Sequence, residues 1–181
     1  CFGLGGRRMN ICKTFGICVA ICVLPLGGCS SDLQGPSDPK EQVMLGDQYS
    51  DGDGVPQDYA AAVKWYRLAA EQGNAEAQDN LGFYYAEGLG VPRDDAEGVK
   101  WTRLAAEQGY LHAQVRLGAM YEAGSYLPND YAEAEKWYRL AAQQGHPSAQ
   151  YHLGMKYANG TGVPQNNAEA VKWYRLAAEK G

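Results

Sequence analysis

The chain has 181 residues, of which 45% are hydrophobic and 20% are charged, and this balance excludes an intrinsically disordered chain. Residues 1–28 contain three bases and no acid, which leaves 13 bases against 21 acids, a net charge of −8, for the rest of the chain. An acidic body repels a phosphate backbone, so we expect no nucleic-acid partner.

Residues 1–28 have the pattern of a bacterial signal peptide, with translation expected to start at Met9. A short basic start is followed by an apolar stretch of 13 residues, Thr14–Leu26, which is too short for the roughly 20 residues that span a bilayer. A plain signal-peptide core, or a short buried helix, is the simpler alternative.

The end of this stretch, Leu26-Gly27-Gly28-Cys29, resembles the lipobox of bacterial lipoproteins. The resemblance implies cleavage behind Gly28 and lipidation of Cys29, and several acyl chains on one residue would give stable anchoring. Ser30, rather than Asp, follows the cysteine, which in that class implies sorting to the outer membrane, facing the periplasm.

All five cysteines lie within residues 1–29, so neither disulfides nor thiolate metal sites are expected to hold the rest of the chain together. Residues 29–40 are polar and contain Gly35, Pro36 and Pro39. This composition predicts a flexible tether that keeps the body off the membrane.

From residue 41 the sequence repeats with a period of 36 residues. The same step separates the tryptophans, the Leu-Gly pairs and the closing glycines; the tryptophans are Trp65, Trp101, Trp137 and Trp173. A fixed period of this size indicates a repeat array. We place the four copies at about 41–74, 75–110, 111–146 and 147–181.

The pattern within each copy predicts two antiparallel helices joined by a glycine-rich loop. In the second copy Ala77, Leu81 and Tyr85 recur at helical spacing, and residues 88–92 then break the helix. The second helix should begin after an Asp or Asn cap; the candidates are Asp58, Asp94 or Asp95, Asn129 or Asp130, and Asn166 or Asn167. It should end at a C′ glycine such as Gly109.

One copy cannot bury its own Trp and Tyr, so neighbouring copies must stack. We therefore predict an all-α fold, an α-solenoid of four 36-residue helix-loop-helix repeats forming a right-handed superhelix. A glycine inside each first helix costs about 1 kcal/mol against alanine, which predicts a close helix approach, with an aromatic ring over the missing side chain. These glycines are Gly46, Gly82, Gly118 and Gly154.

The recurring pattern Ala-Gln-x-x-Leu-Gly-x-x-Tyr, Gly-x-Gly-Val and Ala-x-x-Trp-Tyr-x-x-Ala-Ala-x-x-Gly resembles the Sel1-like repeat (SLR), a relative of the tetratricopeptide repeat. The resemblance covers roughly residues 41–181. It implies a solenoid whose first helices line a concave side that receives a protein or peptide partner. Gly98, Thr102 and the segment Ser125–Leu127 depart from the pattern, so we expect locally different packing in the second and third copies.

Positions that vary between copies on one face of the first helix are candidates for recognition. They are Asp79, Asn80, Phe83, Val115, Arg116, Ala119, Tyr151, His152 and Met155. Large apolar groups left in water hint at a binding surface. The alternative is that these side chains complete the core between repeats, and the sequence leaves the two interpretations open.

Catalytic signals are weak. The three histidines, His112, His146 and His152, lack ligand spacing, so no metal or cofactor is expected. Ser37-Asp38-Pro39-Lys40 fits the Ser-x-x-Lys motif of penicillin-recognising enzymes, but Pro39 in a tether argues against the helix that this motif needs. A cysteine-rich branch of the resembling family has been linked to β-lactamase activity, and its paired cysteines are missing from these repeats.

The preferred hypothesis is therefore a non-enzymatic scaffold in the bacterial cell envelope, anchored by lipid and binding a partner on its concave face. The alternatives are a β-lactam or cell-wall hydrolase, and a regulator of a membrane signalling or secretion complex. The last helix is followed by no polar capping helix, so we expect Trp173 and Leu176 to be more open than their counterparts. Further repeats, or self-association at this C-terminal repeat, would cover them.

Overall fold

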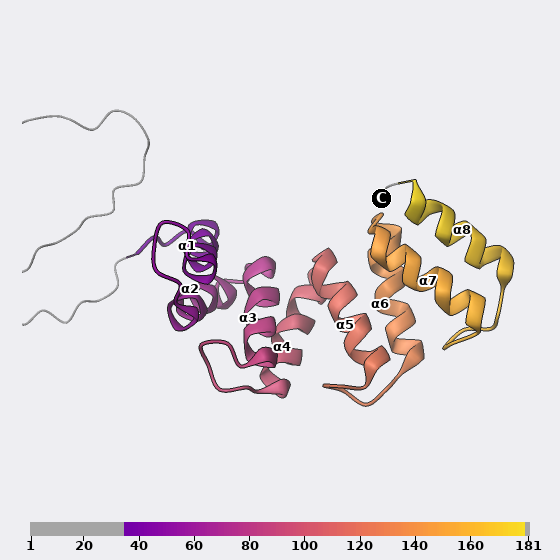
Figure 1. The fold of residues 1–181 in the computed structure, drawn as a ribbon, viewed down its shortest axis with the longest axis horizontal. Coiled ribbons are helices and arrows are strands. Elements are labelled where there is room, and N and C mark those ends of the chain that lie inside the picture. The colour runs from indigo at the N-terminus through magenta and orange to yellow at the C-terminus, as the bar shows by residue number, and fades with distance from the viewer. Residues whose placement is uncertain (1–34, 180–181) are drawn as a thin grey trace, which may run out of the picture. The chain divides into compact units, whose positions relative to one another are not determined.

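The computed structural model describes residues 35–179. The expected signal peptide, its lipobox and Cys29 lie outside this range. Within it the chain forms eight α-helices and no strand (Figure 1). The helices are α1 Pro39–Asp51, α2 Tyr59–Glu71, α3 Ala75–Glu87, α4 Asp95–Glu107, α5 Leu111–Ala123, α6 Tyr131–Gln143, α7 Pro147–Asn159 and α8 Asn167–Ala178.

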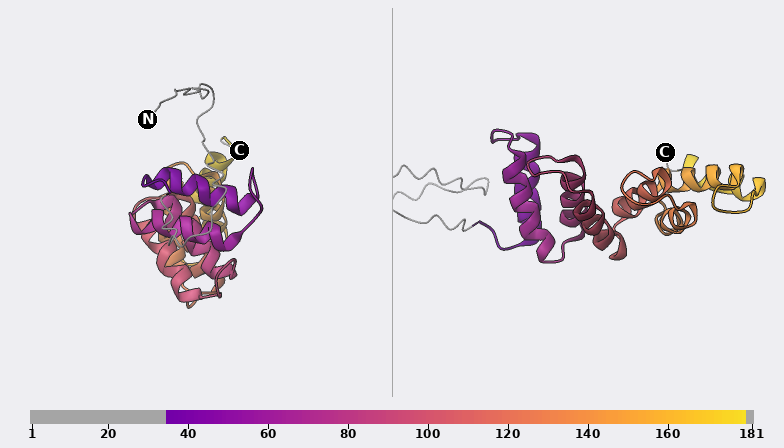
Figure 2. Two further views of the ribbon diagram at one scale, coloured as in Figure 1. Left: turned by 90° about the vertical axis from the view of Figure 1, so that its left-hand side faces the viewer. Right: turned by 90° about the horizontal axis from the view of Figure 1, so that it is seen from below.

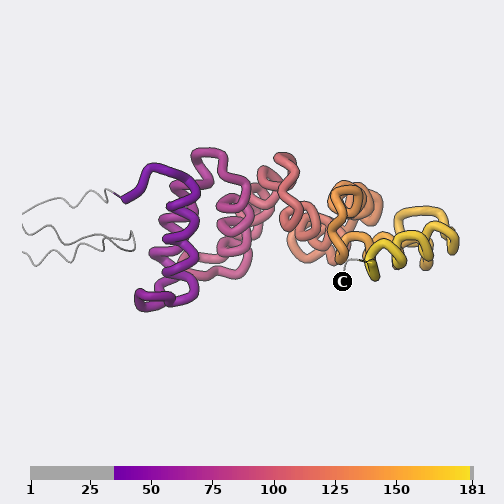
Figure 3. Tube along the Cα trace, turned by 90° about the horizontal axis from the view of Figure 1, so that it is seen from above, coloured from indigo at the N-terminus to yellow at the C-terminus, as the bar shows by residue number. Residues whose placement is uncertain are grey.

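The helices form four antiparallel pairs that follow one another in chain order (Figures 2 and 3). Each helix packs chiefly against its partner in the pair and against the adjoining helix of the next pair. This arrangement confirms the all-α solenoid of four helix-loop-helix repeats. The odd-numbered helices are the first helices of the repeats and the even-numbered ones are the second helices.

The helix ends follow the 36-residue period. Of the alternative caps, the structure uses Asp58, Asp94, Asp130 and Asn166, and each side chain accepts two backbone N–H groups at the start of a second helix. Such caps satisfy donors that a helix leaves unpaired. Gly73, Gly109 and Gly145 follow the second helices with φ between +88° and +89°, as expected for C′ glycines.

The glycines inside the first helices allow the two helices of a pair to approach. A Cβ added at Gly46, Gly118 or Gly154 would stand 2.5, 2.9 or 2.6 Å from a tyrosine ring of the second helix, so an aromatic ring does cover the missing side chain. The second repeat is different, since a Cβ at Gly82 would stand 2.9 Å from the carbonyl oxygen of Gly98. There the helix backbones themselves lie in contact.

Polar side chains join neighbouring repeats in the same way at each junction. A buried glutamine of the first helix donates to a carbonyl of the preceding second helix, as Gln78 does to Ala70 at 3.1 Å and Gln114 does to Ala106 at 3.2 Å. At the three junctions, an arginine of the second helix donates to a tyrosine hydroxyl of the next repeat, as Arg103 does to Tyr121 at 2.9 Å. Since buried polar groups are costly when unpaired, these bonds fix the register between repeats.

The expected tether ends earlier than Lys40. Asp38 caps α1, and Pro39 is its first residue, a position where proline is tolerated because that N–H has no helical partner. The side chain of Gln42 donates to the carbonyl of Pro36 at 2.8 Å, and a Cβ at Gly35 would overlap the ring of Trp65. Residues 35–40 therefore pack against the first repeat.

The expected exposure of Trp173 is wrong, because this side chain is only 7% exposed. It packs with Leu153 and Tyr138 in the core of the last two repeats, since the tryptophan of a second helix faces its own pair and the pair before it. Leu176 is half-buried against the same core. None of the helices between residues 35 and 179 has the length and apolar character needed to cross a membrane.

Candidate binding surface

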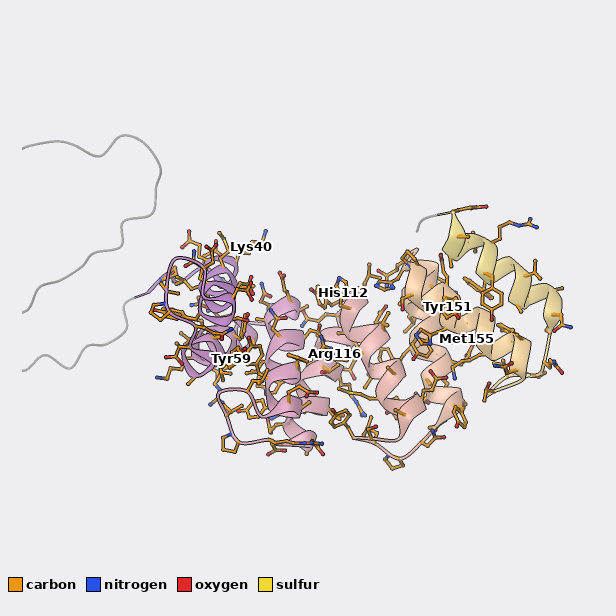
Figure 4. All side chains as sticks on the ribbon, viewed as in Figure 1. Lys40, Tyr59, His112, Arg116, Tyr151 and Met155 are labelled. Carbon is orange, nitrogen blue, oxygen red and sulfur yellow. The ribbon has the colours of Figure 1, made fainter. Side chains whose placement is uncertain are left out.

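The variable positions of the first helices meet where α3 faces α5. Arg116 of α5 reaches back to Asp79 of α3, with 3.0 Å between Nε and Oδ1 (Figure 4). The same guanidinium lies 5.1 Å from the ring centroid of Phe83. Two side chains that we expected to be free for recognition are thus paired with each other, and they connect the second and third repeats.

Asp79 differs most from the expectation, because it is 2% exposed and not on the open surface. Burial raises the pKa of its carboxyl, and the charge of Arg116 opposes that rise. A carboxylate can be buried here because the next repeat supplies its counter-charge. Val115 is half-buried and packs against the core of the last two repeats. This favours the alternative that its side chain completes the core between repeats.

Beside this ion pair, a shallow cavity of about 290 Å³ opens between α3 and α5. Its lining includes Phe83, Arg116 and Ala119, three of the positions expected on the binding face. The other lining residues are Ala86, Glu87, Met120, Ala123 and Tyr126. Phe83 remains 39% exposed at this cavity, so the structure leaves an aromatic ring in contact with solvent there.

The three variable positions of α7 differ in exposure and contacts; two of them, Tyr151 and Met155, are labelled in Figure 4. Tyr151 is 52% exposed and its ring centroid lies 5.6 Å from that of Tyr174. His152 stacks on the ring of Tyr138 at 4.6 Å between centroids, with the planes parallel to within 1°. Met155 is half-buried, as is Asn80 on α3. Tyr151 is therefore the most open of the three variable positions on α7.

A charge cluster with a buried lysine and a half-buried glutamate lies behind His152, and the sequence did not indicate it. The ammonium group of Lys156, a residue 1% exposed, lies 2.9 Å from Oε1 of Glu122 on α5. Tyr138 donates to the other carboxylate oxygen of Glu122 at 3.0 Å. Burial, and then the charge of Glu122, raises the pKa of the Tyr138 hydroxyl. Internal comparison could have found the site, since Lys156 aligns with Tyr84 and Met120, both buried.

A second cavity of about 430 Å³ lies against α4 and also has Tyr126 in its lining. We call it the outer cavity. Its lining is Ala96, Val99, Lys100, Arg103, Leu104, Glu107, Tyr126 and Leu127. The ring of Tyr126 thus borders both cavities, at the segment where the third loop departs from the repeat pattern.

The three histidines of the chain all lie where the third repeat meets the fourth. The rings of His112 and His146 lie 5.5 Å apart, and Nδ1 of His146 accepts the N–H of Ala149 at the start of α7. Burial, and then the charge of His112, lowers the pKa of His146. Burial also lowers the pKa of His152; the Glu122 carboxylate opposes this and the Lys156 ammonium adds to it.

Acidification is therefore expected to destabilise this junction. Both histidine pKa values are lower in the folded chain than the ordinary value of 6.5, so the unfolded chain binds more protons. The contribution to stability is complete above pH 6.5 and is lost as the pH falls through the lower pKa values of the folded chain. Urea unfolding between pH 7.5 and pH 5 should show this slope, and His146→Asn with His152→Gln should flatten it. Equal slopes would contradict the assignment.

The catalytic alternatives gain no support from the geometry. Ser37 lies before the N-cap of α1 and Lys40 lies inside the helix, and both are exposed. Pro39 begins the helix and does not prevent it, but Ser37 is still not on the helix that the Ser-x-x-Lys motif requires. Among residues 35–179, no three His, Cys, Asp or Glu side chains gather as a metal site.

Comparison with known proteins agrees with this architecture. The family model described as the Sel1 repeat matches residues 42–74, 75–110, 111–146 and 147–181. A comparison with curated proteins finds no significant match. Sel1-repeat proteins are generally protein-interaction scaffolds.

Several solved structures are similar. One is c5321, a protective antigen of uropathogenic Escherichia coli with an SLR fold, at 46% identity and a TM-score of 0.76, covering 78% of this chain and 30% of that one. Another is a Sel1 repeat protein from Oxalobacter formigenes, at 40% identity and a TM-score of 0.75, covering 80% of this chain and 60% of that one. Helicobacter pylori cysteine rich protein B is 25% identical, with a TM-score of 0.55, covering 72% of this chain and 93% of that one. The chain thus spans less than two thirds of the first two proteins.

Proposed function

This chain belongs to the Sel1 repeat family, and from that premise we propose that it is a non-enzymatic scaffold which holds a protein partner on the face of its first helices. A lipid on Cys29 anchors it in the bacterial envelope, at the outer membrane and facing the periplasm. The alternatives, a hydrolase and a regulator of a signalling or secretion complex, have no observation of their own in the described residues.

The observation that carries this proposal is the exposure of large apolar side chains on the first helices. Met44 of α1 is 58% exposed, Phe83 of α3 is 39% exposed and Tyr151 of α7 is 52% exposed. Aromatic residues and methionine are enriched at protein interfaces. The second helices also expose apolar groups, among them Leu68 at 41%, so the two faces must be distinguished by experiment.

Photo-crosslinking in intact bacteria tests both parts of the proposal. A photoreactive residue at position 83, and separately at 151, is expected to give a discrete crosslinked species in the membrane fraction, because a partner on the first-helix face contacts both positions. With Cys29→Ala, the chain and its crosslink should move to the soluble fraction, because the lipid attachment site is gone.

A photoreactive residue in place of Leu68 on α2 is the matched control for the second-helix face. Crosslinks from position 68 alone would place the interface on the second-helix face and contradict the proposal. Labelling only near Trp173 would instead favour association through the last repeat. A chain that stays in the membrane fraction with Cys29→Ala would remove the lipid anchor from the proposal.

A further inference from the structure

We propose that Tyr126 opens a binding groove at the junction of the second and third repeats, and that this groove takes a protein segment with an apolar side chain beside basic residues. The inference rests on the proposed function and names the site and the partner's chemistry. It is carried by the contrast between the third loop and the other loops, by the apolar cavity beside Tyr126 and by the charges around that cavity.

The third loop carries a tyrosine where the other three carry a glycine. Gly54, Gly90 and Gly162 occupy this position with φ between +68° and +77°. A Cβ at Gly90 would stand 2.5 Å from the nitrogen of Ala60, and one at Gly162 would stand 2.6 Å from the carbonyl carbon of Tyr131. In both cases the loop lies directly on the start of the preceding second helix, which leaves no space for a side chain.

Tyr126 cannot occupy such a contact, because an L side chain rarely adopts that backbone conformation and its Cβ would overlap the helix. Its hydroxyl instead donates to Glu87 at 3.3 Å, and Arg93 lies 5.7 Å from its ring centroid. Tyr126 lines both the outer cavity and the cavity of about 290 Å³ that Phe83 and Ala119 also line. We call the latter cavity, between α3 and α5, the inner groove.

The chemistry of the inner groove suits an apolar side chain. Most of its lining is apolar: Phe83, Ala86, Ala119, Met120, Ala123 and the ring of Tyr126. The positive charge of Arg116 is already balanced by Asp79, so it offers no free cation to a ligand. Glu87, which is exposed, is the remaining charge on the lining.

Charge complementarity identifies the rest of the segment. The first helices of the first two repeats, α1 and α3, carry five acidic residues and one base besides the paired Asp79. The acids are Glu41, Asp47, Asp51, Glu76 and Glu87, and the base is Lys40. Three cations near the groove or in later repeats are neutralised by acidic partners. Arg116 is paired with Asp79, Lys156 with Glu122, and Arg93 with Asp95 at 2.8 Å. A partner lying along α1 and α3 therefore gains from lysine or arginine, both in association rate and in specificity.

The test uses the purified chain and two labelled peptides of equal length. Each has one central phenylalanine; lysines flank it in one peptide, and glutamates replace them in the other. By fluorescence anisotropy the lysine peptide is expected to bind at least about tenfold more tightly, a difference of about 1.4 kcal/mol. Raising the salt concentration should reduce this preference, because the charges at the groove are exposed. Equal binding of both peptides would overturn the charge assignment.

Variants then locate the site. Tyr126→Gly restores the glycine of the other loops and should weaken binding of the lysine peptide about tenfold by closing the groove, whereas Tyr126→Phe keeps the ring and should bind as the parent does. Phe83→Ala should also weaken binding about tenfold. Glu87→Lys should abolish the preference for lysine, with Asp53→Lys as the control for net charge. Circular dichroism melts confirm that each variant is folded.

Leu104→Ala alters only the outer cavity. If it weakens binding while Phe83→Ala and Tyr126→Gly do not, the segment lies in the outer cavity and the inference is wrong. The two levels of failure can be told apart in intact cells. If the crosslinks from positions 83 and 151 persist with Tyr126→Gly, the groove inference is wrong and the scaffold proposal still holds. If these crosslinks are missing when Tyr126 is present, the scaffold proposal itself is wrong.

Discussion

Replacing Glu122 by alanine is expected to lower the free energy of unfolding by about 3 kcal/mol, since breaking a buried ion pair from one side typically costs about 3–5 kcal/mol. The ammonium of Lys156, which is 1% exposed, would lose the carboxylate 2.9 Å away, and the hydroxyl of Tyr138 would lose its acceptor. The rings of Tyr131 and Tyr138, with centroids 5.2 and 5.8 Å from the ammonium, would remain but cannot balance a full charge.

The matched variant removes the lysine instead of its partner. Lys156→Met places at this position the residue that Met120 supplies one repeat earlier, where it is also buried. The change should cost no more than about 1 kcal/mol, because the charge left behind is that of Glu122, whose side chain is 31% exposed to water and still accepts the Tyr138 hydroxyl. Urea unfolding of the two variants measures the difference. Equal losses would mean that the pair acts through packing and not through charge.

Replacing Thr102 by tyrosine is expected to destabilise the chain by about 3 kcal/mol, the upper end of the usual cost of overpacking a core. The result is unexpected for a consensus substitution, since Tyr66, Tyr138 and Tyr174 occupy this position in the other repeats. Thr102 is fully buried, and a Cβ at Gly82 would stand 2.9 Å from its backbone nitrogen. A ring fits only if α4 moves away from α3.

The new phenol would also lack an acceptor. Tyr66 donates to Asp47 at 2.8 Å and Tyr138 donates to Glu122 at 3.0 Å, but the aligned positions in the second repeat are Phe83 and Ala86. Thermal unfolding followed by circular dichroism measures the loss. Tyr138→Phe serves as the control for the hydroxyl alone and should cost about 1 kcal/mol. An increase in melting temperature for Thr102→Tyr would show that α3 and α4 are less tightly packed than the structure indicates.

The sequence could predict the fold because every structural part recurs at the same step. Caps such as Asp94, closing glycines such as Gly109 and the glycine-under-ring contacts at Gly46 and Gly118 follow from local rules that one copy obeys as well as four. The helix bounds and the repeat boundaries follow from the same rules.

The candidate surface was harder to predict, because its chemistry arises between copies. Comparing aligned positions marks Asp79 and Arg116 as variable, but only the stacking of the third repeat on the second brings them together as an ion pair. The sequence presents His152 as a free polar residue, because its stacking on the ring of Tyr138 depends on how the third and fourth repeats pack. Tyr126 was visible as a departure from the repeat, yet the space that it opens depends on how closely the other loops approach the preceding helix.

The ion pairs of the buried residues Asp79 and Lys156 also determine the order of the second, third and fourth repeats. The glutamine and arginine bonds are the same at each junction, so by themselves they would join the copies in any sequence. Asp79 finds its cation only in the third repeat, and Lys156 finds its anion only there as well. An array with these three repeats in another order would bury one or both charges without a partner. Copies that look alike in sequence are therefore not interchangeable in the structure.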